Sequence, residues 1–297
     1  MTAAPADEPV RCSSWARSVD LSPIATVGSY TEYLLVETPL PWPKDVGEIP
    51  ALAELAAPGR RVQALVPSSL SAGSSERSVT LHRAQGVGFA GYVRTSADQG
   101  ASLATTVAGL GSAAPAPGID VLVCTHGRRD VCCGSLGTDL AIQLSALVPR
   151  EGVHIRRTSH TGGHRFAPTF LVLPEGTGWA FASVELVDQV LDRSVPFSSV
   201  AGHYRGCAGL AGPQVQALER EVLCSVGWEL LDRPRSGRTT GEVTADGGQL
   251  VQLSSGSDTW EAVASPGRTL PVPDCMRPLS EARKSETEWT VSGLRHL

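Results

Sequence analysis

The chain has 297 residues, of which 41% are hydrophobic and 19% charged, the composition of a soluble globular protein. Its formal net charge of -5 gives no general attraction to nucleic acid or to an anionic membrane, so we expect neither as a partner. It has no apolar run of the ~20 residues that a membrane-spanning helix needs, and no apolar signal segment at its start. A cytoplasmic protein is the expectation.

In the first third of the chain, short apolar segments alternate with turn-rich ones. The sequence predicts a helix over 49–57 and strands over 33–37, 61–67 and 79–83. The Gly-rich segment 86–91 lacks the strand-to-helix setting of a dinucleotide site. The small, uncharged run 109–118 is the best linker candidate. We therefore predict an N-terminal α/β domain over 12–112, a second thioredoxin-like unit without ligands for a cluster.

The middle third predicts a compact α/β unit. Residues 119–124 form a β-branched apolar run typical of a buried strand, and helical spacing follows over 137–149. Further strands are expected over 153–159, 169–174 and 178–184, and a helix over 185–193. This order of elements suits a thioredoxin-like domain over 118–205.

The last third predicts a small extension over 206–297. A helix should begin at Pro213, and a hairpin over 241–254 should turn at Asp246-Gly247. Residues 259–264 are expected to add a third strand, and the polar tail 265–297 to be partly loose. The predicted fold class is therefore α/β, with a thioredoxin-like ferredoxin domain, an additional N-terminal α/β domain and a helix-plus-hairpin extension.

Seven cysteines in a reducing compartment argue against a disulfide framework. Four of them are scattered and are interpreted as small buried hydrophobic residues. These are Cys12, Cys207, Cys224 and Cys275. The other three, Cys124, Cys132 and Cys133, fall within ten residues of one another, and this grouping indicates chemistry.

Two cysteines and two histidines are expected to converge at one end of the predicted sheet. Cys124 ends a buried strand, and Cys133 lies in the following loop, before the helix. His160 and His164 flank a Thr-Gly-Gly turn that lets both rings point at one centre. Such a set suits tetrahedral zinc or a [2Fe–2S] cluster with mixed ligands, and spacing alone does not separate the two. The nine-residue step between the cysteines is longer than in a zinc finger.

The segments "CTHGRRDVCCG" and "HTGGHRFAPT" resemble those of the sucrase/ferredoxin-like family, whose pattern is Cys-x-His, six residues, Cys-Gly, then His-x-x-x-His. The resemblance is strong over roughly 120–170. It implies a [2Fe–2S] cluster bound by Cys124, Cys133, His160 and His164, with a redox role. Because this chain has Cys-Cys-Gly, Cys132 competes with Cys133, and the spacing and the following glycine favour Cys133.

Residues beside these ligands receive structural interpretations. His126 is expected to be a supporting residue and not a ligand, because the second Rieske element Cys-x-x-His is missing. Cys132 is interpreted as a bystander, and Asp130 as the partner of a nearby arginine. The arginines beside the ligands are interpreted as a solvated, salt-bridged surface. The alternative is a basic rim that docks an acidic electron donor or raises the cluster potential. The arginines of this rim are Arg128, Arg129, Arg156, Arg157 and Arg165.

The function predicted from the sequence is one-electron transfer coupled to protons, by an electron-transfer protein and not by an enzyme with its own substrate. Neutral imidazole ligands place the expected potential in the Rieske-like range of roughly -150 to +300 mV. Two alternatives stay open. The same four residues could hold zinc in an interaction module, or Cys124 and Cys133, or the Cys132-Cys133 pair, could act as a thiol oxidoreductase. No paired carboxylates indicate glycoside hydrolysis.

Overall fold

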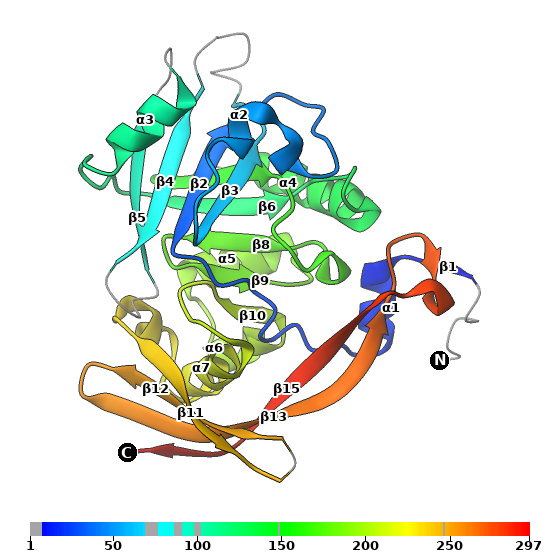
Figure 1. The fold of residues 1–297 in the computed structure, drawn as a ribbon, viewed down its shortest axis with the longest axis vertical. Coiled ribbons are helices and arrows are strands. Elements are labelled where there is room, and N and C mark those ends of the chain that lie inside the picture. The colour runs from blue at the N-terminus through cyan, green and yellow to red at the C-terminus, as the bar shows by residue number, and fades with distance from the viewer. Residues whose placement is uncertain (1–7, 69–76, 86–90, 98–101, 148, 246) are drawn as a thin grey trace.

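The computed structural model describes residues 8–68, 77–85, 91–97, 102–147, 149–245 and 247–297. These residues form a mixed α/β fold around a nine-stranded sheet, with a four-stranded sheet below it (Figure 1). The α/β class predicted from the sequence is confirmed. The division into three domains is not tested by this arrangement and stays a prediction. Asp246 and most of the segment 86–91 lie outside the described residues.

Two successive segments of the chain build most of the large sheet with the same order of elements. They are called the first half, residues 32–110, and the second half, residues 119–192. In each half the first two strands are parallel, the third is antiparallel to the first, and the fourth is antiparallel to the third. The first half contains β2 (Glu32–Glu37), α2 (Pro50–Ala53), β3 (Arg60–Leu65), β4 (Val79–Ala84), β5 (Tyr92–Ala97) and α3 (Leu103–Leu110). The second contains β6 (Ile119–Cys124), α4 (Thr138–Ser145), β7 (Val153–Thr158), β8 (Phe170–Leu173), β9 (Thr177–Trp179) and α5 (Val184–Asp192).

The two halves are joined along one strand edge and across one buried face. Strands β3 and β7 pair antiparallel where Leu65 faces Thr158. Tyr33 and Leu35 of β2 belong to the same buried cluster as Leu122 of β6, and Figure 1 shows β2–β5 running across β6 and β8. Sequence patterns predicted most of these strands, but they left β5 and α3 unassigned.

Strand β6 is buried on both faces and carries the first cysteine of the predicted site at its end. Val121 and Val123 pack into the main core, while Leu122 faces the first half. A near-continuous apolar run is what such a doubly covered strand requires. The strand therefore holds Cys124 at its carboxyl end with no exposed surface.

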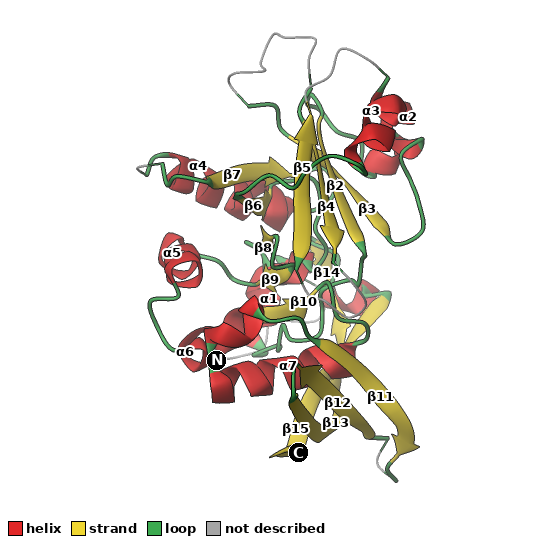
Figure 2. Ribbon diagram, turned by 90° about the vertical axis from the view of Figure 1, so that its left-hand side faces the viewer, coloured by secondary structure: helices red, strands yellow, loops and turns green. Residues whose placement is uncertain are grey.

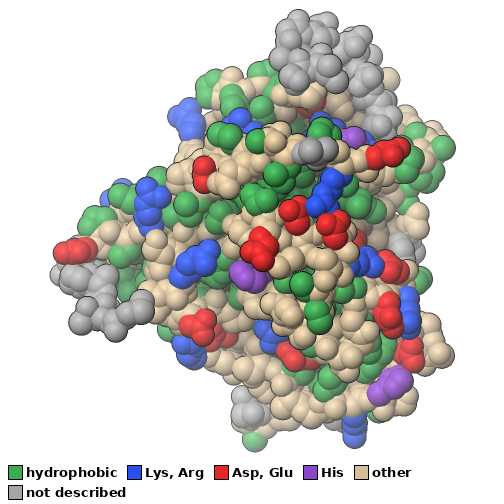
Figure 3. Space-filling view, turned by 180° about the vertical axis from the view of Figure 1, so that it is seen from behind, with side chains coloured by type: hydrophobic (Ala, Val, Ile, Leu, Met, Phe, Trp, Pro, Cys, Tyr) green, Lys and Arg blue, Asp and Glu red, His purple; other side chains and the backbone are tan. Residues whose placement is uncertain are grey.

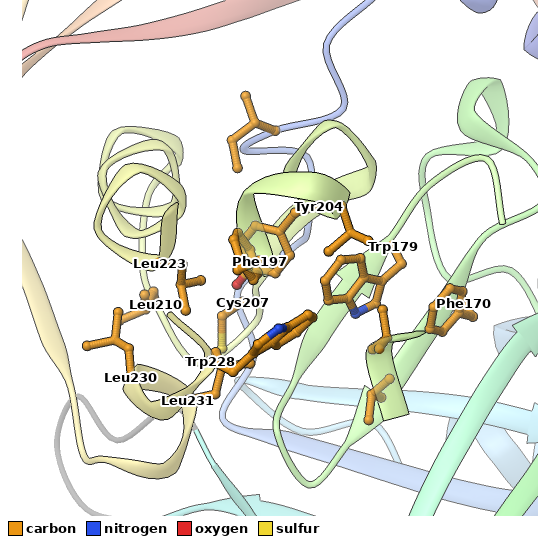
Figure 4. Packing of buried hydrophobic residues seen from close by; sticks show 14 of the residues in the cluster. Phe170, Trp179, Phe197, Tyr204, Cys207, Leu210, Leu223, Trp228, Leu230 and Leu231 are labelled. Atoms are coloured by element: carbon orange, nitrogen blue, oxygen red, sulfur yellow. The ribbon is translucent and has the colours of Figure 1, made fainter. Parts of the chain in front are cut away.

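Aromatic side chains fill the main core between the second half and the extension. Trp179, Phe197, Tyr204 and Trp228 pack edge to face or tilted, with ring centroids 5.0 Å apart for Phe197–Trp228 and 5.1 Å for Trp179–Tyr204 (Figure 4). Such contacts add about 0.5–1.5 kcal/mol each beyond the area they bury. The elements around this cluster include α6 (Phe197–Val200), β10 (Tyr204–Cys207) and α7 (Pro213–Val226), whose start at Pro213 was predicted.

The extension is larger than predicted. The second sheet consists of β11 (Ser236–Val243), β12 (Gln249–Ser255), β13 (Asp258–Val272) and β15 (Lys284–His296). The prediction of a partly loose tail over 265–297 was wrong. Strands β13 and β15 pair from Trp260 opposite His296 to Val272 opposite Lys284. The polar side chains of this arm reflect its exposed faces, since a ladder needs only backbone groups.

The start of the described chain meets the segment between β13 and β15, beside the second half. Strand β1 (Pro9–Val10) pairs with β14 (Arg277–Pro278), and α1 (Cys12–Ser18) follows directly. Figures 1 and 2 show α1 next to the carboxyl end of β13 and the amino end of β15. Among the described residues, no helix combines the length and apolar character needed to cross a membrane.

Candidate metal centre

Three of the four predicted ligands converge at the carboxyl end of β6. The Nδ1 atom of His160 lies 3.8 Å from Cys124 Sγ and 4.0 Å from Cys133 Sγ. The three donor atoms all lie within 4.8 Å of one another, so they could hold a metal ion. Both cysteines are buried and His160 is half-buried. The structure thus places Cys133, and not Cys132, beside Cys124.

Cys133 was predicted to lie in a loop, but it begins the π-helical turn Cys133–Gly137. A carboxylate and close glycine contacts hold this segment in place. Asp130 Oδ1 accepts a hydrogen bond from the Cys133 amide at 3.1 Å. A β-carbon on Gly134 would lie 2.4 Å from Gly127 Cα. A β-carbon on Gly137, in the π-helical turn Cys133–Gly137 that leads into α4, would lie 1.9 Å from the Cys124 carbonyl oxygen. The helix can therefore approach the end of β6 only because these positions lack side chains.

Gly137→Ala is expected to disturb the site directly. The new methyl group must push the Cys124 backbone away, and such overpacking typically costs about 1–3 kcal/mol of unfolding free energy. Gly109→Ala is the control, because a β-carbon at Gly109 in α3 meets nothing within 4 Å. Urea unfolding should show a lower midpoint for Gly137→Ala and an equal or higher one for the control. Equal midpoints for Gly137→Ala and the parent protein would contradict the described packing.

The histidine loop is anchored by the first half of the chain. The carbonyl oxygen of His160 accepts a hydrogen bond from Arg61 Nη2 at 2.6 Å. The Ser159 amide donates to the Ala64 carbonyl oxygen at 2.8 Å, and Ser159 Oγ accepts from the Ala64 amide at 3.1 Å. Strand β3 therefore holds the loop against the cysteines, which gives the N-terminal half a direct role in the site.

The Gly-Gly turn has the tight backbone that the sequence predicted, although only His160 of the two histidines joins the three-residue group. Gly162 and Gly163 have φ values of +87° and +68°, in the left-handed region that favours glycine. A β-carbon on Gly163 would lie 2.4 Å from the guanidinium of Arg205. The turn thus folds back tightly over a buried arginine, and the His160 and His164 ring centroids lie 6.1 Å apart.

His164 lies next to the three-residue group but its Nδ1 faces away from it. This atom is 3.1 Å from Asp130 Oδ2 and 3.2 Å from Cys12 Sγ. Burial would raise the pKa of Asp130, but the hydrogen bond and charge of His164, together with the Cys133 amide, lower it below its ordinary value. The ionised carboxylate favours the tautomer with a proton on Nδ1 of His164, which makes Nε2 the acceptor nitrogen of that ring. The predicted pairing of Asp130 with an arginine was wrong.

The two thiols of the group shift each other's pKa in opposite directions. The neighbouring Cys133 thiol lowers the pKa of Cys124 well below its ordinary value, against burial, and His160 acts in the same direction. The Cys124 sulfur, together with burial, raises the pKa of Cys133. Two buried sulfurs side by side are suited to a cation that displaces thiol protons.

His126 and the predicted rim arginines lie around the three-residue group, and only some of them lie where the sequence predicted. His126 lies outside the group, with Nε2 2.9 Å from the Pro43 carbonyl oxygen, which agrees with a supporting role. Arg128 and Arg129 are exposed, whereas Arg165 contacts Glu286. The remaining basic residues of the predicted rim, Arg156 and Arg157, are half-buried, and Arg156 approaches Asp120 and Glu37.

Sequence patterns missed four residues that surround the site. Arg205 is buried, and burial lowers its pKa to about 10 with Arg165 acting in the same direction, while the Cys124 and Cys133 sulfurs oppose that shift. Cys12 and Cys275 were interpreted as scattered hydrophobic residues, and Cys132 as a bystander. Instead, these three thiols lie together beside Asp130. Their long separations along the chain left no local signal.

Comparison with known proteins gives one result for this region. The family model described as sucrase/ferredoxin-like matches residues 23–206, which is more than half of the chain and includes Cys124, Cys133, His160 and His164. No curated protein and no solved structure matches the chain. The match covers both halves of the nine-stranded sheet and the centre at the end of β6, so the chain belongs to the sucrase/ferredoxin-like family.

Proposed function

We propose that this protein is a one-electron carrier whose [2Fe–2S] cluster is held by Cys124, Cys133, His160 and His164. The observation that carries the proposal is the convergence of two buried thiols and one imidazole within 4.8 Å, with a second imidazole adjoining them. When bound, such a cluster supplies a reversible one-electron couple. The residues of the chain hold this cluster and determine its surroundings.

The donor set fits this group. Cys124 and Cys133 provide sulfur from one loop, and His160 provides Nδ1 from the other. Asp130 keeps the proton on Nδ1 of His164, so that Nε2 is the available donor of that ring. A pair of cysteines and a pair of histidines on opposite loops matches the ligand division of a Rieske-type cluster, where histidines serve one of the two irons.

Burial is uneven across the site, and this supports electron transfer. The cysteine side has no exposed surface, whereas His160 and His164 are half-buried, with 19% of the His164 side chain exposed. Electrons and protons would therefore enter and leave through the imidazoles. A purely structural zinc site is closed and needs no such opening.

The reduction potential should fall as the pH rises. Each ring has one nitrogen for the metal and one that carries a proton, and oxidation makes that proton easier to lose. The slope should approach about -59 mV per pH unit where one proton accompanies one electron. Potentiometric titration followed by visible absorption between about pH 6 and 10 measures it. A potential that stays constant over this range would count against imidazole ligands.

Arg205 should raise the reduction potential. Its buried cation lies close enough to the two cysteines that their charges affect its pKa, so it favours the more negative, reduced state of the site. Arg205→Gln is expected to lower the potential by tens of mV, on the order expected for one charge at short range. Arg205→Lys, which keeps the charge, is the control. The two variants having the same potential would contradict an electrostatic role.

The partner is proposed to be an acidic redox protein that docks on the exposed arginines beside the site. Arg128 and Arg129 are the exposed cations of the cysteine loop, while Arg165 is already paired. Elsewhere the surface is mixed, and Figure 3 shows acidic and basic side chains interspersed on the face it displays.

All seven cysteines are free, which supports the proposal of a reducing, cytoplasmic location.

A further inference from the structure

A second group of metal-binding side chains lies next to the first. Cys12, Asp130, Cys132 and Cys275 place their donor atoms within 4.8 Å of one another. Cys132 Sγ is 3.2 Å from Cys275 Sγ, and Cys12 Sγ is 3.6 Å from Asp130 Oδ2. Three of these residues are buried and Cys275 is half-buried.

Three distant parts of the chain supply these side chains. Cys12 begins α1, Cys132 lies at the helical start that precedes the π-helical turn Cys133–Gly137, and Cys275 lies between β13 and β14. Pairing of Pro9 in β1 with Pro278 in β14 brings Cys12 and Cys275 together at this point. Cys12 and Cys275 fall outside residues 23–206, so half of this group lies outside the region that the family model matches.

The chemistry of the group selects one class of ligand. Three thiols and one carboxylate make a four-donor set, and thiolate-rich tetrahedral sites without an open position are typical of structural zinc. A zinc–sulfur distance of ~2.3 Å places two sulfur ligands ~3.8 Å apart, the same scale as the separations observed. The Cys132–Cys275 separation of 3.2 Å exceeds the ~2.05 Å of a disulfide bond. We infer that Cys12, Asp130, Cys132 and Cys275 bind a structural Zn²⁺.

The hydrogen bonds of the first site orient one of these ligands. Asp130 Oδ1 accepts from the Cys133 amide, so its orientation is fixed by the loop of the first site. Such outer contacts orient metal ligands and support their negative charge.

The zinc would fasten the start of α1 and the segment between β13 and β14 to the segment that carries Cys132 and Cys133. Asp130 contacts His164, and Cys132 directly precedes Cys133, so the two metal centres would share one loop and differ in their ligands. The vicinal cysteines are thereby divided, with Cys132 assigned to zinc and Cys133 to the iron site. The assignment of Cys132 to zinc does not depend on the proposed electron-transfer function, whereas that of Cys133 rests on it.

The test is the metal content of the full-length chain, purified without air. The parent protein should contain one zinc per chain in addition to iron. The double variant Cys12→Ser/Cys275→Ser should lose the zinc and keep its iron and its visible spectrum. Cys224→Ser, which removes a half-buried thiol outside both groups, should keep both metals.

A second measurement covers the case in which the double variant does not fold. Parent protein freed of zinc and titrated with Co²⁺ should bind one equivalent and show the intense visible bands of tetrahedral cobalt thiolate. Three results would overturn the inference. These are a zinc content that the double variant leaves unchanged, cobalt bound without the tetrahedral spectrum, and a Cys132–Cys275 disulfide found by alkylation and mass analysis. Iron and sulfide contents report on the first site alone, so the two proposals can fail separately.

Discussion

Cys133→Ser protein purified without air should contain essentially no iron–sulfur cluster, whereas Cys132→Ser protein should keep it. The two cysteines are adjacent in the sequence, but only Cys133 lies with Cys124 and His160. Removing a thiolate that binds the cluster leaves a neutral, weaker donor in its place, and metal affinity should fall by well over tenfold. Iron and acid-labile sulfide per chain measure the outcome.

The pair of variants also separates the two metal centres. Cys132→Ser should retain iron but lose zinc, because its sulfur faces Cys275. Cys224→Ser serves as the control for general effects of removing a thiol. If Cys132→Ser loses the cluster and Cys133→Ser keeps it, then the assignment of the vicinal cysteines is reversed and the described loop geometry is wrong.

Replacing a histidine ligand by cysteine should lower the reduction potential by more than about 100 mV. A third thiolate makes the site more negative and disfavours the added electron, moving the potential from the Rieske-like range toward the roughly -400 mV of four-cysteine clusters. We expect this for His160→Cys and for His164→Cys. The slope of potential against pH should also decrease, because one protonated ring has been removed.

His126→Gln is the matched control for the histidine variants. The His126 ring is hydrogen-bonded to the Pro43 carbonyl oxygen and lies edge-on to Trp42. Its replacement should therefore not affect the potential as replacement of a ligand would. Protein-film voltammetry or potentiometric titration gives the values. An unchanged potential in His164→Cys would remove that residue as a ligand and leave the group of Cys124, Cys133 and His160.

Local sequence patterns were sufficient for most elements of the site. The apolar run of β6, the helical spacing of α4 and the Gly-Gly turn each express a requirement of a few neighbouring residues. The nine-residue spacing between Cys124 and Cys133 and the position of His160 and His164 follow from those elements. Such features are readable because burial and backbone geometry restrict residue type over short distances.

Contacts between distant segments could not be predicted in the same way. The pairing of β3 with β7 involves one residue on each strand, and the meeting of Cys12, Cys132 and Cys275 depends on strands β1 and β14 of two residues each. The long β13–β15 arm was missed because its polar surface resembles that of a loop. Arg205 gave no local signal either, since nothing in "HYRGC" distinguishes a buried cation from an exposed one.

The most direct measurement is the visible spectrum of the full-length protein purified without air, followed by electron paramagnetic resonance after reduction with dithionite. We predict absorption between about 400 and 600 nm and a reduced signal of low average g, the signature of a [2Fe–2S] cluster with histidine ligands. A colourless protein that contains zinc and, after reconstitution with iron and sulfide, still no cluster would contradict the electron-transfer proposal.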